Sequence, residues 1–224
     1  MSSATLIVSQ VFSVVPDFVR EAQSILRDGS TFQWSTVALL GLVTYVYSVE
    51  IERRRWDIIL AGLAFSMMDL FNEMVNSAIF HATDRAPLWT VTGDTSFLIF
   101  IGFTIEILFL FAVLGVAFVK QLPSDPKAKI LGVNNRLALV LGFSVICVII
   151  ELFLVSTGYF HWEYWWWNEP FIPLIVIFGY GTFFGVAAWV FDMGKNHRRQ
   201  VKVVGSMAAV NLVLGLSLGL ASWL

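Results

Sequence analysis

The sequence predicts an all-α membrane protein, in which six transmembrane helices follow an amphipathic helix on the membrane surface. Of the 224 residues, 58% are hydrophobic and only 13% are charged, whereas soluble domains carry about 25% charged residues. Six apolar stretches, each near the roughly 20 residues that cross the hydrocarbon core, occupy most of the chain. Basic residues also gather in alternate loops between these stretches. We therefore expect residues 1–224 to form a single transmembrane domain.

The distribution of basic residues predicts the orientation of the spans. Eleven of the 14 Lys and Arg residues lie in the loops after the first, third and fifth spans. Loops rich in Lys and Arg stay in the cytoplasm, so both termini are expected on the non-cytoplasmic side. Two small-xxx-small pairs, Gly181 with Gly185 and Gly215 with Gly219, predict close helix packing in the last two spans. The six predicted spans are residues 34–50, 57–80, 95–119, 137–158, 171–192 and 203–223.

The first 30 residues predict an interfacial helix rather than a seventh span or a signal peptide. The segment has no basic start, and its unbroken apolar run is short. Polar residues occupy the opposite face, and Pro16 is expected to kink the helix. Two roles remain open for it, a membrane anchor and a lid over a site. The apolar residues at helical spacing are Val8, Val11, Phe12, Val15, Phe18, Val19, Ala22, Ile25 and Leu26.

Composition and motifs narrow the functional class. A formal net charge of −2 argues against a nucleic-acid surface. Cys147 is the only cysteine, so no disulfide within the chain is expected. No Walker, Rossmann or nucleophile-elbow motif occurs, and we expect no cofactor.

A polar cluster in the second span is the first candidate for chemistry. It consists of Asp69, Asn72, Glu73 and Asn76, and the helical repeat places Asp69, Glu73 and Asn76 on one face. Ionisable residues inside a membrane are costly and are functional candidates by default. The alternative is that these side chains only join neighbouring helices through hydrogen bonds.

Two further acids are expected to converge on this cluster. Glu106 is placed near the middle of the third predicted span, and Glu151 lies in the fourth at the depth of Glu73. No Lys or Arg lies inside a predicted span to neutralise them. A protonated carboxyl in an apolar cavity can act as a general acid, and an ionised neighbour as a base. The predicted catalytic residues are therefore Glu73, Asp69, Glu151 and Glu106.

The predicted outer loops supply a second group of candidates. Residues 159–167 contain seven aromatic side chains, which form either an interfacial belt or the wall of a pocket for an apolar or cationic species. His81, His161 and Glu163 lack the paired spacing of a metal motif, so no metal site is predicted. The predicted substrate-binding residues are Asn72, Asn76, Trp89, Asp94, His161, Trp162, Glu163, Tyr164, Trp166 and Asn168.

Two segments carry a family resemblance. Leu40 to Tyr47, and the run from Asp69 to Phe80, resemble the early part of the small integral-membrane terpene cyclases of meroterpenoid and indole-diterpene pathways. The resemblance implies that Glu73 protonates an epoxide or alkene. That family has seven spans and a second acid near its end, whereas the last span here has none. The general plan is also similar to sterol-isomerase and sigma-receptor-like membrane proteins.

The sequence thus favours a membrane enzyme without a cofactor that starts the cyclisation or isomerisation of an isoprenoid or other lipid by acid catalysis. Its partners are expected to be the membrane and a hydrophobic small molecule or lipid substrate. The competing prediction is a non-enzymatic accessory subunit, or a protein that handles lipids or ions. A pore would need a polar stripe through the cytoplasmic half, where there is little beyond Ser66 and Ser144.

Overall fold

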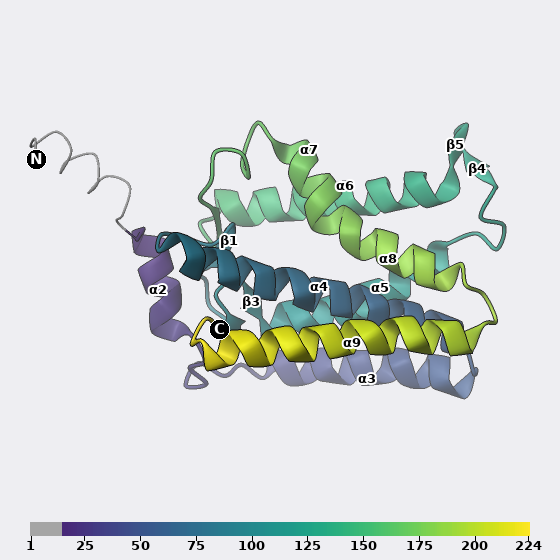
Figure 1. Ribbon diagram of the computed structural model, residues 1–224, viewed down its shortest axis with the longest axis horizontal. Coiled ribbons are helices and arrows are strands. Elements are labelled where there is room, and N and C mark those ends of the chain that lie inside the picture. Colours follow the sequence, from purple (N-terminus) through teal and green to yellow (C-terminus); the bar gives the residue numbers. More distant parts are fainter. Residues whose placement is uncertain (1–14) are drawn as a thin grey trace, which may run out of the picture.

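The computed structural model describes residues 15–224 and contains six long helical segments that run along one another (Figure 1). The expected all-α membrane bundle is confirmed. Four of the segments, α4, α6, α7–α8 and α9, are long and apolar enough to cross a membrane. The other two, α3 and α5, have 18 and 17 residues, at the short end of the range of about 17–25 residues for a span. The bounds are α3 Ser35–Glu52, α4 Trp56–Thr83, α5 Ile105–Gln121, α6 Asn135–Ser156, α7 Ile172–Leu174, the π-helix η1 Ile175–Tyr180, α8 Gly181–Phe191 and α9 His197–Leu220.

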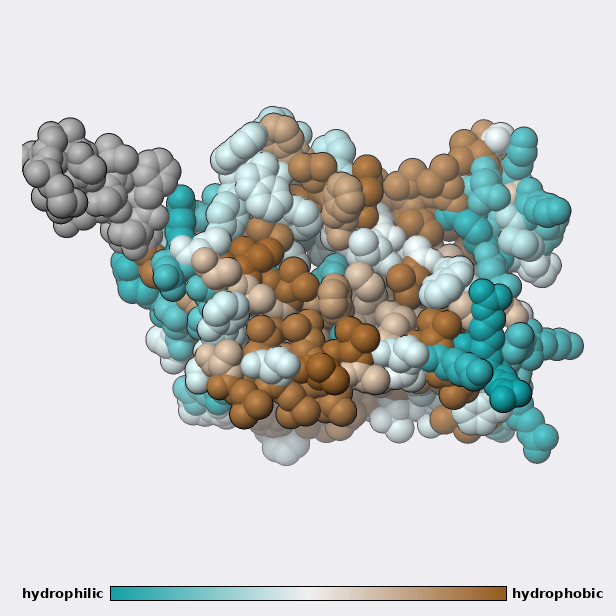
Figure 2. Space-filling view, in the orientation of Figure 1, coloured by the Kyte–Doolittle hydropathy of each residue, from teal (hydrophilic) through white to brown (hydrophobic). Residues whose placement is uncertain are grey.

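Helix α4 lies at the centre of the bundle, where it contacts α3, α5, α8 and α9. Half of the residues in the most apolar 18-residue stretch of α4 are buried, compared with 22% for α6 and 11% for α9. Figure 2 shows hydrophobic residues over the middle of the molecule and hydrophilic residues towards its ends. Because α6 and α9 expose apolar side chains along their length, their outer faces are suited to contact lipid.

The third predicted span begins about ten residues too early. Residues 98–104 form an antiparallel hairpin of β2 (Leu98–Phe100) and β3 (Phe103–Thr104). Helix α5 starts only after Thr104, whose Oγ1 accepts a hydrogen bond from the Ile107 amide at 3.2 Å. The predicted start at residue 95 was therefore wrong. The reason is that a short apolar run fits a strand as well as a helix.

The hairpin and two further short strands form one end of the bundle, called here the hairpin end. Strand β1 (Trp89–Val91) pairs antiparallel with β6 (Phe160–Trp162), which joins the loop after α4 to the loop after α6. The chain as described begins and ends at the hairpin end (Figure 1). The sequence predicted no strands here, because each has only two or three residues.

The described part of the N-terminal segment contains α2 (Asp17–Ile25), which packs on protein. Val19 and Ala22 are fully buried, and Leu26 forms a β-bridge with Leu98. The helix begins after Pro16, and the predicted kink involves a segment before Pro16 that lies outside the described residues. Within residues 15–224 this helix therefore packs on the hairpin end, and its two expected roles, a membrane anchor and a lid, stay predictions. The predicted apolar positions Val8, Val11 and Phe12 lie outside the described residues.

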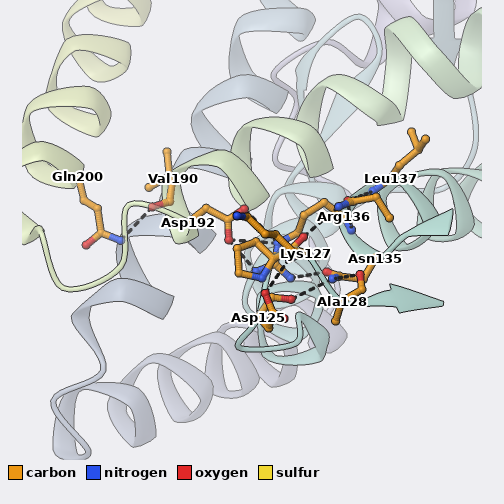
Figure 3. Close-up of polar contacts among 11 residues, drawn as sticks. Asp125, Lys127, Ala128, Asn135, Arg136, Leu137, Val190, Asp192 and Gln200 are labelled. Carbon is orange, nitrogen blue, oxygen red and sulfur yellow. Dashed lines mark hydrogen bonds and ion pairs between the residues drawn. The ribbon is translucent and has the colours of Figure 1, made fainter. Parts of the chain in front are cut away.

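The opposite end, called here the basic end, carries the loops with most of the Lys and Arg residues, among them the β4–β5 hairpin (Lys129–Ile130 and Val133–Asn134). Figure 3 shows the contacts that fasten these loops. Arg136 Nη2 lies 2.6 Å from Asp192 Oδ1 and joins the start of α6 to the end of α8. The Gln200 amide donates to the Val190 carbonyl oxygen at 3.0 Å and ties α9 to α8.

Helices α4 and α5 approach closely at two glycines that lie outside the predicted pairs. A Cβ atom on Gly115 would lie 2.9 Å from the Phe65 Cβ and 3.0 Å from the Gly62 carbonyl oxygen. A Cβ on Gly185 would meet nothing within 4 Å. The predicted pairing of Gly181 with Gly185 therefore does not produce close packing. Gly115 has no small residue four positions away, and the small-xxx-small spacing of Gly62 with Ser66 was not among the predicted pairs.

We expect Gly115→Ala to lower the free energy of unfolding by about 1–3 kcal/mol, because the added methyl group forces α4 and α5 apart. Gly185→Ala is the matched control. It should be neutral or stabilise by up to about 1 kcal/mol through its higher helix propensity. Equilibrium unfolding in mixed detergent micelles measures both variants. Equal stability of the two would contradict the close approach at Gly115.

Candidate functional site

A small cavity of about 50 Å³ lies between α4, α5, α6 and η1, near the hairpin end. Three carboxyl side chains face it, and Asp69, Glu73 and Glu151 are only 2%, 5% and 7% exposed. Two of the carboxyls come from consecutive turns of α4 and one from α6. The structure thus brings Glu151 to the acids of α4 as predicted, whereas Glu106, which was expected to converge with them, does not line this cavity. The aromatic residues of the wall are Trp89, Phe111, Phe160, Trp167, Tyr180 and Phe183.

No cationic side chain among residues 15–224 pairs with the three carboxyls. The Asp69 carboxyl also makes no hydrogen bond to a described residue. Asn72, one turn along α4, donates to the Thr182 hydroxyl at 3.2 Å and does not line the cavity. Three ionised carboxylates cannot share an apolar cavity without positive charge nearby. The cavity is therefore suited to hold protons on its carboxyls or a positively charged group.

The Glu73 carboxyl accepts hydrogen bonds from the indole of Trp89, and Asn76 in turn bonds to the backbone of Trp89. The Trp89 Nε1 donates to Glu73 Oε1 and Oε2 at 3.0 and 3.2 Å. Asn76 is fully buried. Its Oδ1 accepts from the Leu88 and Trp89 amides at 2.7 and 3.2 Å, and its Nδ2 donates to the Trp89 carbonyl oxygen at 2.8 Å. Asn76, predicted to bind substrate, instead positions the loop that carries Trp89.

Glu151 has polar neighbours but is left without a hydrogen bond on one oxygen. Its side chain lies beside the indole of Trp162 and the phenol of Tyr180. Glu151 Oε2 and Trp162 Nε1 are both buried, and neither has a partner of normal hydrogen-bond geometry within the described chain. Unpaired buried polar atoms are rare in folded proteins. This wall of the cavity is therefore prepared for a water molecule or a ligand atom.

The wall opposite α4 is π-helical. The segment η1 contributes Ile175, Gly179 and Tyr180 to the cavity. At its end the Gly181 amide donates to the Val176 carbonyl oxygen, five residues back, and a Cβ on Gly181 would lie 2.8 Å from that oxygen. Glycine is therefore required for this turn. π-Helical turns are rare and are frequent at functional sites.

The aromatic wall only partly matches the residues predicted from the loop. Trp89 lines the cavity as expected, but Phe160 and Trp167 do so from the aromatic loop in place of its predicted residues. The rings of Trp89 and Trp167 stack with centroids 6.0 Å apart. Tyr180 and Phe183 were missed because their span has no acid or amide near its middle to indicate which face meets the other helices.

Glu106 does not reach the cavity. It accepts hydrogen bonds from the Thr95 hydroxyl at 2.6 Å and the Ser96 amide at 2.8 Å, and so organises the segment before β2. Asp94, predicted to bind substrate, also lies in this segment, and its carbonyl oxygen accepts from the Tyr159 hydroxyl. Burial raises the pKa of the Tyr159 phenol, and the charges of Glu106 and Asp94 raise it further.

Two more predicted residues take part in contacts at the hairpin end. The His161 ring stacks on Phe18 of the α2 region with centroids 4.6 Å apart, and its Nε2 lies 3.1 Å from the Thr92 hydroxyl. Glu163 forms an ion pair with Arg85 at 2.5 Å. Neither side chain lines the cavity.

The other predicted loop residues also lie outside the cavity. The Tyr164 hydroxyl donates to the Ala86 carbonyl oxygen at 2.7 Å, and Asn168 donates to the Trp162 carbonyl oxygen at 3.1 Å. Trp162 is buried against Glu151, and Trp166 is 37% exposed. These side chains belong to the loop after α6, which packs over the hairpin end beside the cavity. Within residues 15–224 no group of three His, Cys, Asp or Glu side chains is arranged to hold a metal ion.

An apolar layer separates the cavity from the basic end. Phe65, Phe118 and Phe184 are fully buried there and pack edge to face. These rings belong to the large apolar core between α4, α5 and α8. The carboxyl cavity therefore lies in one half of the bundle, on the hairpin side of this apolar layer.

The fold and the site together define an integral membrane protein with a buried acidic cavity walled by aromatic side chains. A family model described as an uncharacterized membrane protein family matches residues 16–219, and the chain belongs to that family. It is 44% identical over 204 residues to an uncharacterized protein of Archaeoglobus fulgidus, across 91% of this chain and 97% of that protein. No solved structure matches the chain.

Proposed function

We propose that the protein is a membrane enzyme that uses the buried carboxyls to protonate an isoprenoid or similar lipid and so starts its cyclisation or isomerisation. The observation that carries this proposal is the set of three carboxyls facing one aromatic cavity without a cationic partner. A protonated carboxyl supplies the acid, and a second carboxyl accepts the final proton. The aromatic faces stabilise the positive charge that develops between these steps. The resemblance to terpene cyclases points in the same direction.

The roles follow from the surroundings of each acid. Glu73 is the proposed acid, because Trp89 fixes its carboxyl at the cavity wall. Glu151 lies on the opposite wall and is the proposed acceptor of the final proton. The cavity of about 50 Å³ has room for only a few atoms, since one water molecule needs roughly 10–15 Å³. One alkene or epoxide group enters it under this proposal, and longer substrates must displace wall side chains.

We also propose that the basic end faces the cytoplasm, by the positive-inside rule. Both ends of the described chain then lie on the non-cytoplasmic side with α2 and the carboxyl cavity. A cysteine placed in the exposed turn at Arg54 should react with a membrane-impermeant thiol reagent only after the cells are opened. Labelling of intact cells would reverse the proposed orientation.

Glu73→Gln should reduce turnover by about 100-fold or more, because it removes the acid while keeping the size of the side chain. Membranes with each variant are incubated with linear, epoxidised and quinone-linked isoprenoids, and products are resolved by chromatography coupled to mass detection. The expected product has the mass of the substrate and a new retention time. Glu52→Gln, exposed at the far end of α3, is the control and should keep full activity.

Two outcomes would overturn the proposal. A fully active Glu73→Gln variant removes the acid from the mechanism. If the folded wild type yields no product from any substrate, a non-enzymatic accessory subunit becomes the better assignment.

A further inference from the structure

A second cavity lies beneath α2, between α4, the β2–β3 hairpin and the end of α9. It encloses about 190 Å³, more than the carboxyl cavity. Its polar lining consists of Gln23 of α2, Ser77 and His81 of α4, and Ser222 after α9. Apolar side chains, among them Phe80 and Ile101, complete the wall. Nothing in the reaction proposed above uses these residues.

Ser77 differs from the helical serines of this chain that bond to their own backbone. Ser66, Ser144 and Ser217 each donate to the carbonyl oxygen four residues earlier. Ser77 is 3% exposed, lines the second cavity, and its hydroxyl makes no hydrogen bond to any residue from 15 to 224. Because Ser77 lines the cavity, a ligand or water there can complete the hydrogen bonding of its hydroxyl.

The chemistry of the lining selects an uncharged polar group. None of the lining residues is Lys, Arg, Asp or Glu, so no side chain provides the ion pair that phosphates, carboxylates or ammonium groups require when buried. Ser77, His81 and Gln23 can each donate or accept a hydrogen bond. Trp223 stacks on the His81 ring with centroids 5.9 Å apart and supplies a flat apolar face.

The second cavity is next to the carboxyl cavity. Ser77 follows Glu73 by one helical turn on the same face of α4, a rise of about 6 Å. Ile101 and Gly102 are consecutive in the hairpin, and they line the second and the first cavity respectively. A molecule that occupies both cavities must pass the junction between Asn76, Trp89 and Gly102, where the side chains pack closely.

We propose that the second cavity binds the hydroxyl end of a lipid alcohol through Ser77, His81 and Gln23. The binding site stands on its own geometry. That the bound alcohol is the polar end of the substrate rests on the function proposed above. The hydroxyl anchors the substrate and sets which of its carbon atoms reaches Glu73, provided that the side chains at the junction of the two cavities move apart when the substrate binds.

The test is photo-crosslinking of the full chain in phospholipid nanodiscs. The probe is a long-chain alcohol with a diazirine beside the hydroxyl, and analogues ending in a carboxylate and a trimethylammonium group serve for comparison. Mass spectrometry of the peptides shows the labelled residues. The alcohol should label the peptides that contain Ser77–His81 and Trp223, with the charged analogues at least about fivefold weaker. Ser77→Ala should reduce labelling by the alcohol about fivefold, the effect of one lost hydrogen bond.

Matched variants make the outcomes distinct. Ser66→Ala, whose hydroxyl already bonds to the Gly62 carbonyl oxygen, should label like the wild type. Glu73→Gln should also label normally, so an inactive protonation site and an unused alcohol site give different results. Labelling that is equal for the three probes, absent for the alcohol, or unchanged in Ser77→Ala would overturn the assignment.

Discussion

Replacing Asn76 with alanine should lower the free energy of unfolding by about 3 kcal/mol or more. Its side chain satisfies two backbone amides and one carbonyl oxygen in the loop of Leu88 and Trp89. Asn76 and Leu88 are buried, so alanine leaves polar backbone groups without partners, at a cost of about 1–3 kcal/mol each. The same loss frees Trp89, which then no longer fixes the Glu73 carboxyl.

Two measurements separate these effects. Equilibrium unfolding in mixed micelles gives the stability, with Asn72→Ala as the control that loses one hydrogen bond, to Thr182, and about 1 kcal/mol. Protonation activity at a temperature where both variants remain folded should fall by about 100-fold for Asn76→Ala, because Glu73 loses its orientation. If both variants lose the same stability, the network around Asn76 does not hold the loop.

The helix bundle could be predicted from the sequence because it depends mainly on the length and spacing of apolar stretches along the chain. Apolar stretches of sufficient length must form helices in lipid, where every backbone polar group needs an internal partner. The acids of α4 could be placed together for a related reason, since Asp69 and Glu73 share a face at helical spacing. Glu151 followed from depth counting along the fourth span.

Glu106 shows where depth counting fails. The predicted span began at residue 95, which put Glu106 near the membrane centre. In the structure α5 begins at Ile105, so Glu106 lies in the first turn and bonds to the preceding segment. Its depth depended on where the helix begins, and the hairpin before it has the same apolar composition as a helix.

The aromatic wall depended on tertiary contacts that no periodicity reveals. Phe160 and Trp167 reach the cavity because β6 pairs with β1, and a pairing of three residues leaves no reliable pattern. Tyr180 faces the carboxyls because η1 is π-helical, which shifts every later side chain relative to an α-helix. Gly181 was noticed as a packing residue, yet its actual role is to permit that turn.

At the basic end, removing both cations around Glu50 should destabilise the bundle strongly. Glu50 is fully buried at the end of α3. Lys120 Nζ of α5 lies 2.8 Å from its Oε1, and Arg55 Nε lies 2.5 Å from its Oε2. The double variant Arg55→Met, Lys120→Met leaves the carboxylate without a cation in a buried position. The expected loss is about 3–5 kcal/mol, the usual cost of breaking a buried ion pair from one side.

The origin of this loss can be tested by adding Glu50→Gln to the double variant. If the unpaired charge is the cause, the triple variant should recover more than half of the lost stability, because a neutral amide is far cheaper to bury. Arg53→Met with Lys127→Met removes the same charge from exposed positions of the same loops and should change stability by less than about 1 kcal/mol. A triple variant as unstable as the double variant would mean that the long side chains act by packing over the helix ends. Recovery would instead identify Glu50 as the residue through which charge fastens α3 and α5 together.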